Sequence, residues 1–392
     1  MSGQTSIMPK RPGISRMIFV ISLVAVAAVS GVTGYFSYGL LHPGAPNETL
    51  NGAGATFPFP FLSAVSTNYS RIHPNVQINY QAIGSGGGIK ALTAKTVDFA
   101  ASDAPLNKNQ VGNLTAAALH IPETIGAVVL GYNVLENDGK TKVSTGLNLT
   151  APILAKVFLS TTSNPVYWDD PAIVSLNPSL QSSLPHQPVI PVHRSDGSGT
   201  TFVFTGYLNT AASSTWTLGQ GTAVAWPGGL GASGNQGVAG VVLGTTYTMG
   251  YIELAYVLTN PISYGYVQNA DGNNYVKPSL ATVTNAVNNA TSTISLPQGN
   301  QSWSSVSLLN AKGPNSYPIV SFTYMLEYKE LSVIPGMTLD KAKALVDFLW
   351  FVVHDGQAQG PSLGYVQLPA SVLAIDEASI KSITFNGQSL PT

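Results

Sequence analysis

Apolar residues in the first third of the chain form short strand-like stretches that alternate with stretches of helical spacing. The pattern predicts strands at 76–80, 97–101 and 126–132, and a helix that begins the segment 89–94. Strands that alternate with helices in this order are typical of a mostly parallel sheet wrapped by helices. We therefore expect an α/β fold.

The middle of the chain carries its own strands and helices, which we expect at 153–159, 189–193 and 199–208. Two stretches lack such a pattern. Residues 227–244 are so rich in glycine that we expect a loop there, and residues 267–316, dense in Asn and Ser, are expected to form a surface excursion.

An amphipathic helix is predicted near the C-terminal end, at 339–353. Its apolar residues recur at helical spacing, Thr338 is a suitable N-cap, and Asp355-Gly356 provides a stop signal. We expect this helix to cover a sheet and to have a structural role.

Residues 17–41 contain no charged side chain. A helix of that length is about 37 Å long, enough to cross a hydrocarbon core of about 30 Å with some tilt. The first charge after it is Glu48, and the basic residues before it are Lys10, Arg11 and Arg16. The positive-inside rule therefore places residues 1–16 in the cytoplasm and the rest of the chain outside the cell.

The same segment has a second interpretation. Ala25-Val26-Ala27 resembles a signal-peptidase site, so a removed signal peptide is the alternative to a retained transmembrane helix. The apolar run continues well past that site, which favours an anchor in the cell membrane. Residues 42–49, with two prolines, are then expected to form a short linker to the rest of the chain.

Composition limits the partners that the chain can have. Its 392 residues, 44% of them hydrophobic, suffice for more than one lobe. The net charge of −1 argues against binding to nucleic acid, which requires a basic face. Charged residues make up only 9%, against roughly 25% in ordinary soluble proteins. This low share suits an extracytoplasmic, acidic setting, although lineage bias explains it equally well.

The chain has no cysteine, which excludes disulfides, thiolate metal sites and a lipid-modified cysteine anchor. Its six histidines are scattered without the spacing of a metal site. We therefore expect no metal and no cofactor.

Three short segments rich in Gly, Ser and Thr, at 52–58, 84–90 and 194–202, each precede a predicted helix. The free N–H groups and the positive dipole end of a helix N-terminus attract a tetrahedral oxyanion. Glycine allows the backbone to approach such an anion closely. Each segment alone is more often an ordinary helix cap, but together they predict an anion-binding site.

Two charged residues complete this predicted site. The guanidinium of Arg194 can bind two oxygens of one anion, and Asp196 can hold that guanidinium in place. His193 would add a second positive charge only at low pH.

Asp103 decides the type of anion. A carboxylate fits an anion site only if the ligand carries a proton that it can accept, as hydrogen phosphate does and sulfate does not. The alternative is that Asp103 only caps a helix that starts after Pro105.

Nucleotide-binding and hydrolytic functions fit poorly. Lys90 stands between Ile89 and Ala91, so the Walker pattern is incomplete. A serine hydrolase would pair Ser198 with His193, but Asp196 occupies the first position of the expected Gly-x-Ser-x-Gly elbow. A serine hydrolase or phosphatase remains a remote alternative, and we expect a protein that is not an enzyme.

The chain resembles the phosphate-binding receptors of phosphate ABC transporters, the PstS type, and looks like an archaeal, membrane-anchored member. The resemblance rests on the three Gly-rich segments and on further strings, in order, over most of residues 50–370. These strings lie at 96–105, 167–171, 249–253 and 317–319. The ligands that the resemblance implies are Thr56, Phe57, Ser85, Ser198, Gly199 and Thr200. The chemistry of the charged residues adds Arg194 and Asp103, with Asp196 in support.

The resemblance implies a two-lobed fold of the periplasmic-binding-protein type (type II-like), with a hinge and an interlobe cleft. Lobe one would comprise residues 50–133 and 319–392, and lobe two residues 134–318. The implied function is that of a monomeric, extracytoplasmic receptor that binds inorganic phosphate and delivers it to an ABC permease. A receptor for sulfate, molybdate or phosphonate is the alternative.

Overall fold

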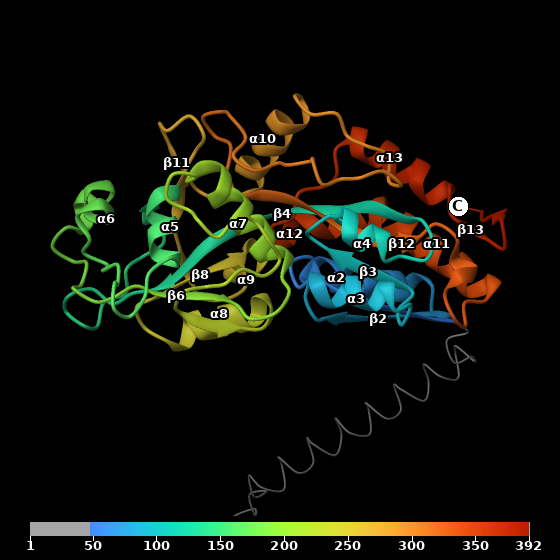
Figure 1. Cartoon of the computed structure of the whole chain (residues 1–392), viewed down its shortest axis with the longest axis horizontal. Coiled ribbons are helices and arrows are strands. Elements are labelled where there is room, and N and C mark those ends of the chain that lie inside the picture. The colour runs from blue at the N-terminus through green and yellow to red at the C-terminus, as the bar shows by residue number, and fades with distance from the viewer. Residues whose placement is uncertain (1–47, 392) are drawn as a thin grey trace, which may run out of the picture. The chain divides into compact units, whose positions relative to one another are not determined.

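The computed structural model describes residues 48–391, and its centre is a nine-stranded sheet (Figure 1). The strand order is β2-β1-β3-β12-β4-β8-β6-β7, and β9 also pairs with β4. The strands of this sheet are β1 (Glu48–Gly54), β2 (Val76–Ala82), β3 (Phe99–Ser102), β4 (Ala118–Asn133), β6 (Ile190–Arg194), β7 (Leu230–Ala232), β8 (Thr248–Glu253), β9 (Ser263–Tyr264) and β12 (Val320–Tyr328).

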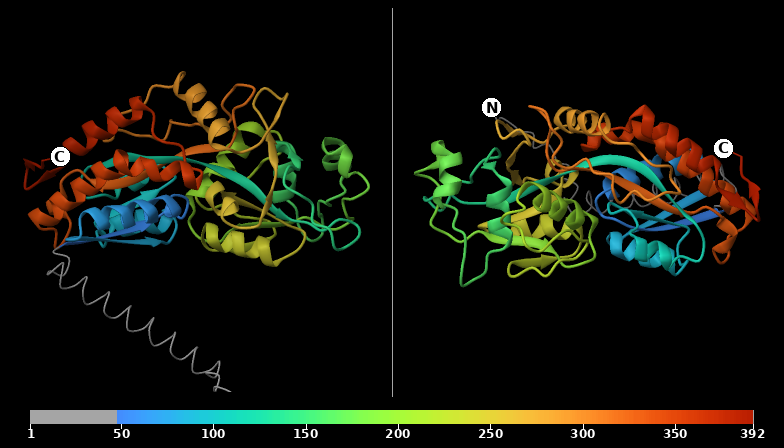
Figure 2. Two further views of the ribbon diagram at one scale, coloured as in Figure 1. Left: turned by 180° about the vertical axis from the view of Figure 1, so that it is seen from behind. Right: turned by 45° about the horizontal axis from the view of Figure 1, so that its top comes forward.

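The sheet has two halves that share the long strand β4. Residues 118–127 of β4 pair with β12, and residues 128–133 pair with β8, both antiparallel. On one side β12 continues to the parallel strands β3, β1 and β2, and on the other β8 continues to the parallel strands β6 and β7. Figure 1 and Figure 2 show β4 running from one half of the molecule into the other.

Helices cover each half of the sheet separately. In the first lobe, α2 (Phe59–Ile72), α3 (Ser85–Thr93) and α11 (Leu339–Val353) pack on the strands β1 to β3. In the second lobe, α5 (Ala151–Phe158), α7 (Gly199–Ala211) and α8 (Gly234–Gly244) pack on or near β6 and β8. The expected two-lobed α/β fold is therefore confirmed.

The remaining elements are short or peripheral. The helices are α4 (Lys108–Gly112), α6 (Pro171–Leu176), α9 (Leu254–Leu258), α10 (Leu280–Thr291), α12 (Gly360–Leu363) and α13 (Ala370–Lys381). The strands are β5 (Asn148–Leu149), β10 (Tyr266–Gln268), β11 (Tyr275–Val276), β13 (Thr384–Phe385) and β14 (Gln388–Ser389). Three turns of 3₁₀-helix are η1 (Pro178–Leu180), η2 (Leu331–Val333) and η3 (Asp355–Gln359).

Most elements expected from the sequence lie where they were predicted. The strand at 76–80 lies within β2, the run 126–132 lies within β4, and the predicted C-terminal helix is α11. The hydroxyl of Thr338 caps α11 by accepting a hydrogen bond from the Lys341 N–H at 3.1 Å. The lobe boundaries at 133/134 and 318/319 stay a prediction; the change of pairing partner along β4 falls between residues 127 and 128.

The loop expected at 227–244 is wrong, because this stretch contains β7 and α8. The helix buries Val238 and Val242 against β8, where Gly250 leaves room: a Cβ added at Gly250 would lie 2.8 Å from Val238. Burial of one face stabilises a helix despite its glycines, and a count of glycines does not register that contribution.

The excursion expected at 267–316 is more ordered than its composition indicated. It contains α10, whose N-cap Ser279 forms a reciprocal capping box with Thr282. Val283 and Val287 of α10 are buried, and Trp303 farther along is fully buried. The stretch therefore has many exposed polar residues, while its apolar residues are buried on its inner side.

The predicted N-terminal tail, the membrane segment at 17–41 and most of the linker lie outside the described residues. Glu48 and Thr49, which were assigned to the linker, already belong to β1. Within residues 48–391 no helix is both long and apolar enough to cross a bilayer.

Several carboxyl groups are buried without a hydrogen-bond partner. Both side-chain oxygens of Glu327, on β12, and of Asp376, on α13, lack a partner among the described residues. Burial, with smaller contributions from Asp98 and Glu123, raises the pKa of Glu327 well above its usual range, and burial does the same for Asp376. These groups are therefore neutral acids in the folded protein.

This predicts a pH dependence of stability. A raised pKa in the folded state means that the folded protein holds a proton that the unfolded chain releases, so stability falls as pH rises above about 4.5. We expect Glu327→Gln to flatten the decline between about pH 5 and pH 8, by up to about 1.4 kcal/mol per pH unit. Urea unfolding at several pH values measures how the free energy of unfolding changes with pH. Asp340→Asn, at a side chain 81% exposed, is the control. Equal slopes for Glu327→Gln and the wild type would contradict the assignment.

Candidate anion-binding site

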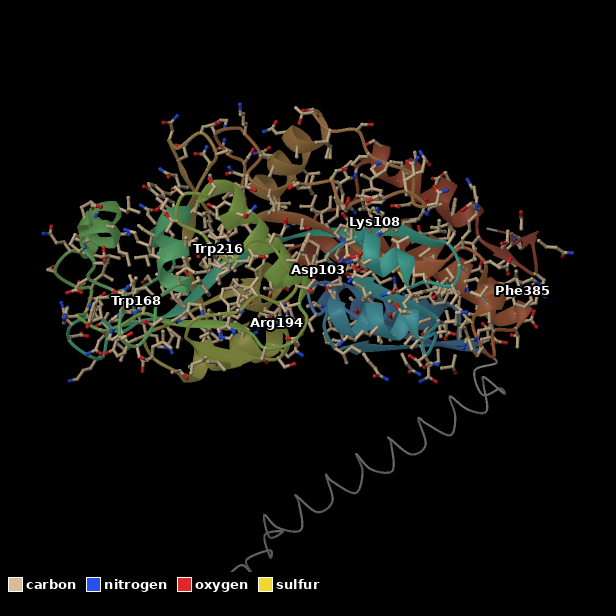
Figure 3. All side chains as sticks on the ribbon, viewed as in Figure 1. Asp103, Lys108, Trp168, Arg194, Trp216 and Phe385 are labelled. Atoms are coloured by element: carbon tan, nitrogen blue, oxygen red, sulfur yellow. The ribbon has the colours of Figure 1, made fainter. Side chains whose placement is uncertain are left out.

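The predicted site residues come from the carboxyl ends of β1 and β3 in one half of the sheet and of β6 in the other half, and they meet where the two lobes face each other. Thr56 and Phe57 follow β1, Asp103 follows β3, and Arg194 ends β6. Ser85 begins α3, and Ser198 is the N-cap of α7. Figure 3 shows Asp103 and Arg194 in the middle of the molecule, between the two halves. Sites at the carboxyl ends of parallel strands are the rule in α/β sheets.

Asn235, at the start of α8, joins the two lobes within this site. Its Nδ2 donates to Thr56 Oγ1 and to Thr200 Oγ1, both at 3.0 Å, and its backbone N–H donates to Thr56 Oγ1 at 3.1 Å. Its Oδ1 accepts from the Glu253 N–H at 3.0 Å. Asn235 therefore holds a hydroxyl of lobe one and a hydroxyl of lobe two side by side.

These bonds also orient the two hydroxyl protons. Thr56 Oγ1 accepts two hydrogen bonds from Asn235, and Thr200 Oγ1 accepts one from Asn235 and one from Arg194 Nη1 at 3.3 Å. A hydroxyl oxygen has two acceptor positions and one proton. Both hydroxyl protons therefore point away from Asn235 and Arg194 and remain available to another acceptor.

Backbone N–H groups at the site are buried and unpaired. Five of them have no hydrogen-bond partner within residues 48–391, and they belong to Thr56, Phe57, Ser85, Gly199 and Thr200. Buried N–H groups without an acceptor are rare and costly, so a cluster of them indicates an acceptor ligand. The N-termini of α3 and α7 add positive dipole ends.

Arg194 is buried and rigidly held. Its Nε donates to Asp196 Oδ1 at 2.7 Å, its Nη2 donates to Asp196 Oδ2, and its backbone N–H donates to the Tyr251 hydroxyl at 2.9 Å. Burial raises the pKa of Asp196, but the hydrogen bonds and charge of Arg194 outweigh this, and the pKa is lowered overall. With a third N–H on Thr200, two of the five guanidinium N–H groups remain for a ligand.

Asp103 is buried with one oxygen paired and one free. Its Oδ1 accepts from the Thr323 hydroxyl at 2.9 Å, and its Oδ2 has no partner within the described residues. A Cβ added at Gly199 would lie 2.3 Å from this Oδ2, so the free oxygen faces the N-terminus of α7. Burial raises the pKa of Asp103 to about 7, against the lowering effects of Thr323 and Arg194.

The capping role considered for Asp103 is wrong. The helix after Pro105 is α4, and its N-cap is Asn107, which forms a capping box with Gln110. No backbone group of α4 bonds to Asp103.

His193 was expected to add a positive charge only at low pH, and its surroundings disfavour that charge further. Its ring stacks on Trp226 with centroids 5.2 Å apart, and its Nδ1 lies 3.1 Å from the Arg194 carbonyl oxygen. Burial lowers the pKa of His193. These contacts also weaken the serine-hydrolase interpretation, because the His193 ring is held by Trp226 and the Arg194 carbonyl and forms no hydrogen bond with Ser198.

Sequence reasoning missed Asn235 and Thr323. Asn235 lies in the glycine-rich stretch that was taken for a loop, and Thr323 is one polar residue in an apolar strand. In the structure Gly234, the first residue of α8, has a positive φ of 71°, and Ser233 before it is the N-cap. Without the fold, nothing connects Asn235 with residues so distant in sequence.

The lobes close over the site at its mouth. The Gly86 N–H of lobe one donates to the Gly197 carbonyl of lobe two at 2.8 Å. A Cβ at Gly86 would lie 3.1 Å from the Gly197 Cα, so a larger residue at position 86 would force the two loops slightly apart. An open groove of about 790 Å³ lies beside this contact, with Ile83 and Lys90 in its wall.

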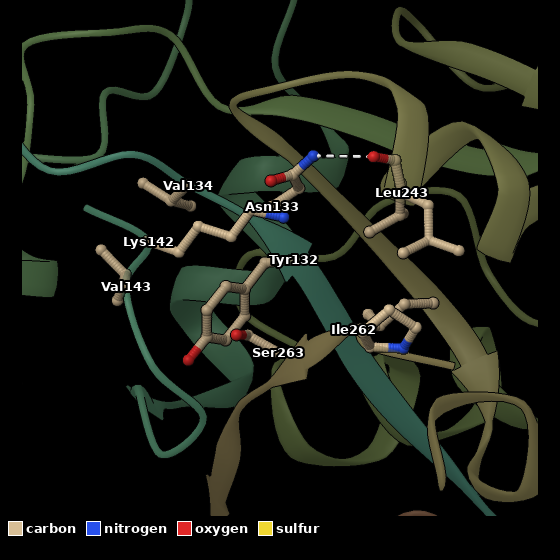
Figure 4. Close-up of a pocket in the computed structure, with 10 residues that line it drawn as sticks. Tyr132, Asn133, Val134, Lys142, Val143, Leu243, Ile262 and Ser263 are labelled. Carbon is tan, nitrogen blue, oxygen red and sulfur yellow. Dashed lines mark hydrogen bonds between the residues drawn. The ribbon is translucent and has the colours of Figure 1, made fainter. Parts of the chain in front are cut away.

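A second pocket, drawn in Figure 4, lies apart from these residues. Tyr132, Asn133 and Ile262 line it, and its volume is only about 10 Å³. That volume holds at most about one water molecule. It is too small for a tetrahedral oxyanion. Within residues 48–391 no cluster of His, Asp and Glu is suited to a metal ion.

The chain is similar to known proteins of one superfamily. A family model described as a PBP superfamily domain matches residues 42–355. "Phosphate-binding protein PstS" of Xylella fastidiosa (strain Temecula1) is 41% identical over 339 residues, which cover 84% of each chain. The protein of the same description from Methanocaldococcus jannaschii is 33% identical, over 94% of this chain and 95% of its own.

Solved structures share the fold. A high-affinity periplasmic phosphate-binding protein (PfluDING), solved with phosphate, has a TM-score of 0.66 at 20% identity, over 84% of this chain and 93% of its own. A human phosphate-binding apolipoprotein has a TM-score of 0.64 at 18% identity, over 88% of this chain and 100% of its own.

The geometry predicts that Asn235 stabilises the protein. Asn235→Ala leaves the buried Glu253 N–H without an acceptor, and we expect the free energy of unfolding to fall by about 2 to 3 kcal/mol. Chemical denaturation without added anion measures this. Asn288→Ala, on the exposed face of α10, is the control and should change stability by less than about 0.5 kcal/mol. Similar effects of the two substitutions would show that Asn235 contributes no more than a surface residue.

Proposed function

The chain belongs to the PstS phosphate-binding proteins of the PBP superfamily, and from this membership we propose that it binds inorganic phosphate between its lobes. The chain is the solute-binding component of an ABC transporter. It receives phosphate outside the cytoplasm and delivers it to a permease. It is not an enzyme. The observation that carries the proposal is the cluster of buried, unpaired N–H groups beside Arg194 and Asp103.

The donors of the site match the oxygens of one phosphate. Five backbone N–H groups, two free N–H groups of Arg194 and the hydroxyls of Thr56, Ser85, Ser198 and Thr200 are available to it. Most of these donors are neutral, and the charge of Arg194, the one cation among these residues, is balanced by Asp196. We propose that hydrogen bonds and helix dipoles, rather than net charge, hold the anion.

Asp103 would select phosphate over a fully ionised oxyanion. Its free Oδ2 can accept the O–H of hydrogen phosphate, whereas sulfate presents only acceptors and would be repelled. A buried acceptor that needs a ligand proton can discriminate by about 10⁴-fold or more. The same argument disfavours molybdate. Phosphonate, which can carry a proton, is not excluded by this argument.

We propose that the shared strand β4 is part of the hinge. Lobe one would comprise residues 50–133 and 319–392, and lobe two residues 134–318, so that the connections run through β4 and into β12. Supporting this, the Ile319 carbonyl accepts from the Val128 N–H at 2.9 Å, where β4 changes partner. Closure would then be stabilised by contacts from both lobes to one phosphate.

We also propose that residues 17–41 anchor a monomeric receptor in the cell membrane. This rests on the absence of charge in that segment and on the basic residues before it. A short linker would then hold the receptor near its permease.

The phosphate proposal is tested by calorimetric titration with phosphate and with sulfate at one ionic strength. We expect phosphate to bind and sulfate to bind at least about 10⁴-fold more weakly. Asp103→Asn should narrow this ratio, because an amide offers sulfate a donor in place of a charge. Asp376→Asn, at a buried acid outside the site, is the matched control and should leave the ratio unchanged. Absence of phosphate binding by the wild type overturns the function; an unchanged ratio in Asp103→Asn overturns the role of Asp103.

The anchor is tested by fractionation of the full chain. A helix that spans a core of about 30 Å should keep the protein in the membrane fraction after alkaline carbonate washing. A chain that begins at residue 48 should be released. A mature, soluble protein whose N-terminus lies near Ala28 would show that the segment is a removed signal peptide.

A further inference from the structure

The hydroxyl of Thr323 lies between two buried carboxyl groups. On β12, Thr323 Oγ1 is 2.9 Å from Asp103 Oδ1 and 3.1 Å from Glu123 Oε1. All three side chains are almost completely buried. Since a hydroxyl has one proton, Thr323 can donate to only one of the two carboxyls. The other contact is favourable only if that carboxyl is protonated and donates to Thr323.

The surroundings decide which carboxyl holds the proton. Asp103 is stabilised as a carboxylate by the charge of Arg194 and by the Thr323 hydroxyl. Glu123 has the negative Asp103 as its neighbour, and its Oε2 has no partner within the described residues. A buried carboxylate without a cation is costly, whereas a buried carboxylic acid that donates one hydrogen bond is not. Glu123 is thus the acid, and Asp103 the carboxylate.

We propose that Glu123 and Thr323 form a hydrogen-bond relay, Glu123 O–H to Thr323 and Thr323 O–H to Asp103, that keeps Asp103 ionised and oriented toward the ligand. The inference rests on the proposed phosphate-binding function and assigns two positioning residues that determine its specificity. Thr323 occupies Oδ1 of Asp103, so that Oδ2, beside Gly199, is the oxygen left to accept the proton of phosphate.

The relay makes binding depend on the protonation of Glu123. If Glu123 loses its proton, two carboxylates compete for one hydroxyl, and a second negative charge lies behind Asp103. That charge disfavours the ionised form of Asp103 and repels an anionic ligand. Burial raises the pKa of Glu123 to about 8 and that of Asp103 to about 7, so the order of the two agrees with the geometry.

Other titratable groups face this pair from the surrounding elements. Arg194 is the cation among them, and the neighbouring acids are Glu253 and Glu327, whose pKa values burial raises well above the usual range. The remaining neighbours are tyrosines with raised pKa values: Tyr80, Tyr256, Tyr324 and Tyr365. Glu327 lies on the same strand as Thr323 but has no hydrogen bond to it, which makes it the matched control.

The test compares the phosphate dissociation constants of wild type and Glu123→Gln from about pH 6 to pH 9. The titration of phosphate itself is common to both proteins and cancels in the ratio. Gln can donate to Thr323 but cannot ionise, so high pH should weaken phosphate binding by the wild type more than by the variant. The dissociation constant of the variant, divided by that of the wild type, should therefore fall at least about tenfold across this range. The ratio for Glu327→Gln should stay within about twofold. A ratio for Glu123→Gln that does not change with pH overturns the relay.

A second pair of variants tests the hydroxyl. Thr323→Val removes it at nearly constant volume and should weaken phosphate binding by about tenfold or more near neutral pH. Thr323→Ser should recover most of this loss. Equal losses in Val and Ser variants overturn the role of the hydroxyl.

A measurement without phosphate separates this inference from the function on which it rests. Carboxyl carbon NMR of the ligand-free protein should show Glu123 protonated at about pH 7, and Thr323→Val should shift the titration of both Glu123 and Asp103. An ionised Glu123 at that pH overturns the relay even if phosphate binds. Failure of the wild type to bind phosphate, with Glu123 protonated, overturns only the function.

Discussion

The burial of hydrogen-bond donors that the protein itself leaves unpaired is the constraint on which the rest of this structure depends. Thr56, Ser85 and Gly199 each present an N–H to the same enclosed space, from segments that are far apart in sequence. An unpaired buried donor costs about 1 to 3 kcal/mol, so each one must be held by surrounding structure. Strands β1, β3 and β6, the N-termini of α3 and α7, and the carboxamide of Asn235 supply that support.

A second feature of the site follows from the same low-dielectric setting. Its formal charges are few and are paired: Arg194 with Asp196, and Asp103 with a hydroxyl. A receptor with surplus cations would bind any oxyanion, whereas neutral donors and one carboxylate acceptor make binding depend on the proton of the ligand. In the proposed function, specificity depends on the number and position of donors and acceptors, and the proposed relay extends this set through Thr323 to Glu123.

The two halves share one sheet and one continuous hydrophobic core. β4 passes through both halves, while each half has its own helices. Hydrogen bonds join the lobes at the site: Asn235 and the Tyr256 hydroxyl bond to Thr56, Gly86 bonds to Gly197, and the Tyr365 hydroxyl bonds to Glu253. Hydrogen bonds of this kind can be exchanged for bonds to a ligand or to water.

The sequence by itself determined the local features. The period of apolar residues located β2, β4 and α11, and the Gly-Ser-Thr segments indicated helix N-termini suited to an anion, because these signals depend on residues close together in the chain. Tertiary structure alone decided the rest. Helix α8 forms because β8 buries its valines, Asn235 acts because Thr56 and Thr200 lie on either side of it, and Glu123 stays neutral because Thr323 and Asp103 surround it. Each of these depends on neighbours that are distant in sequence, which only the folded chain brings into contact.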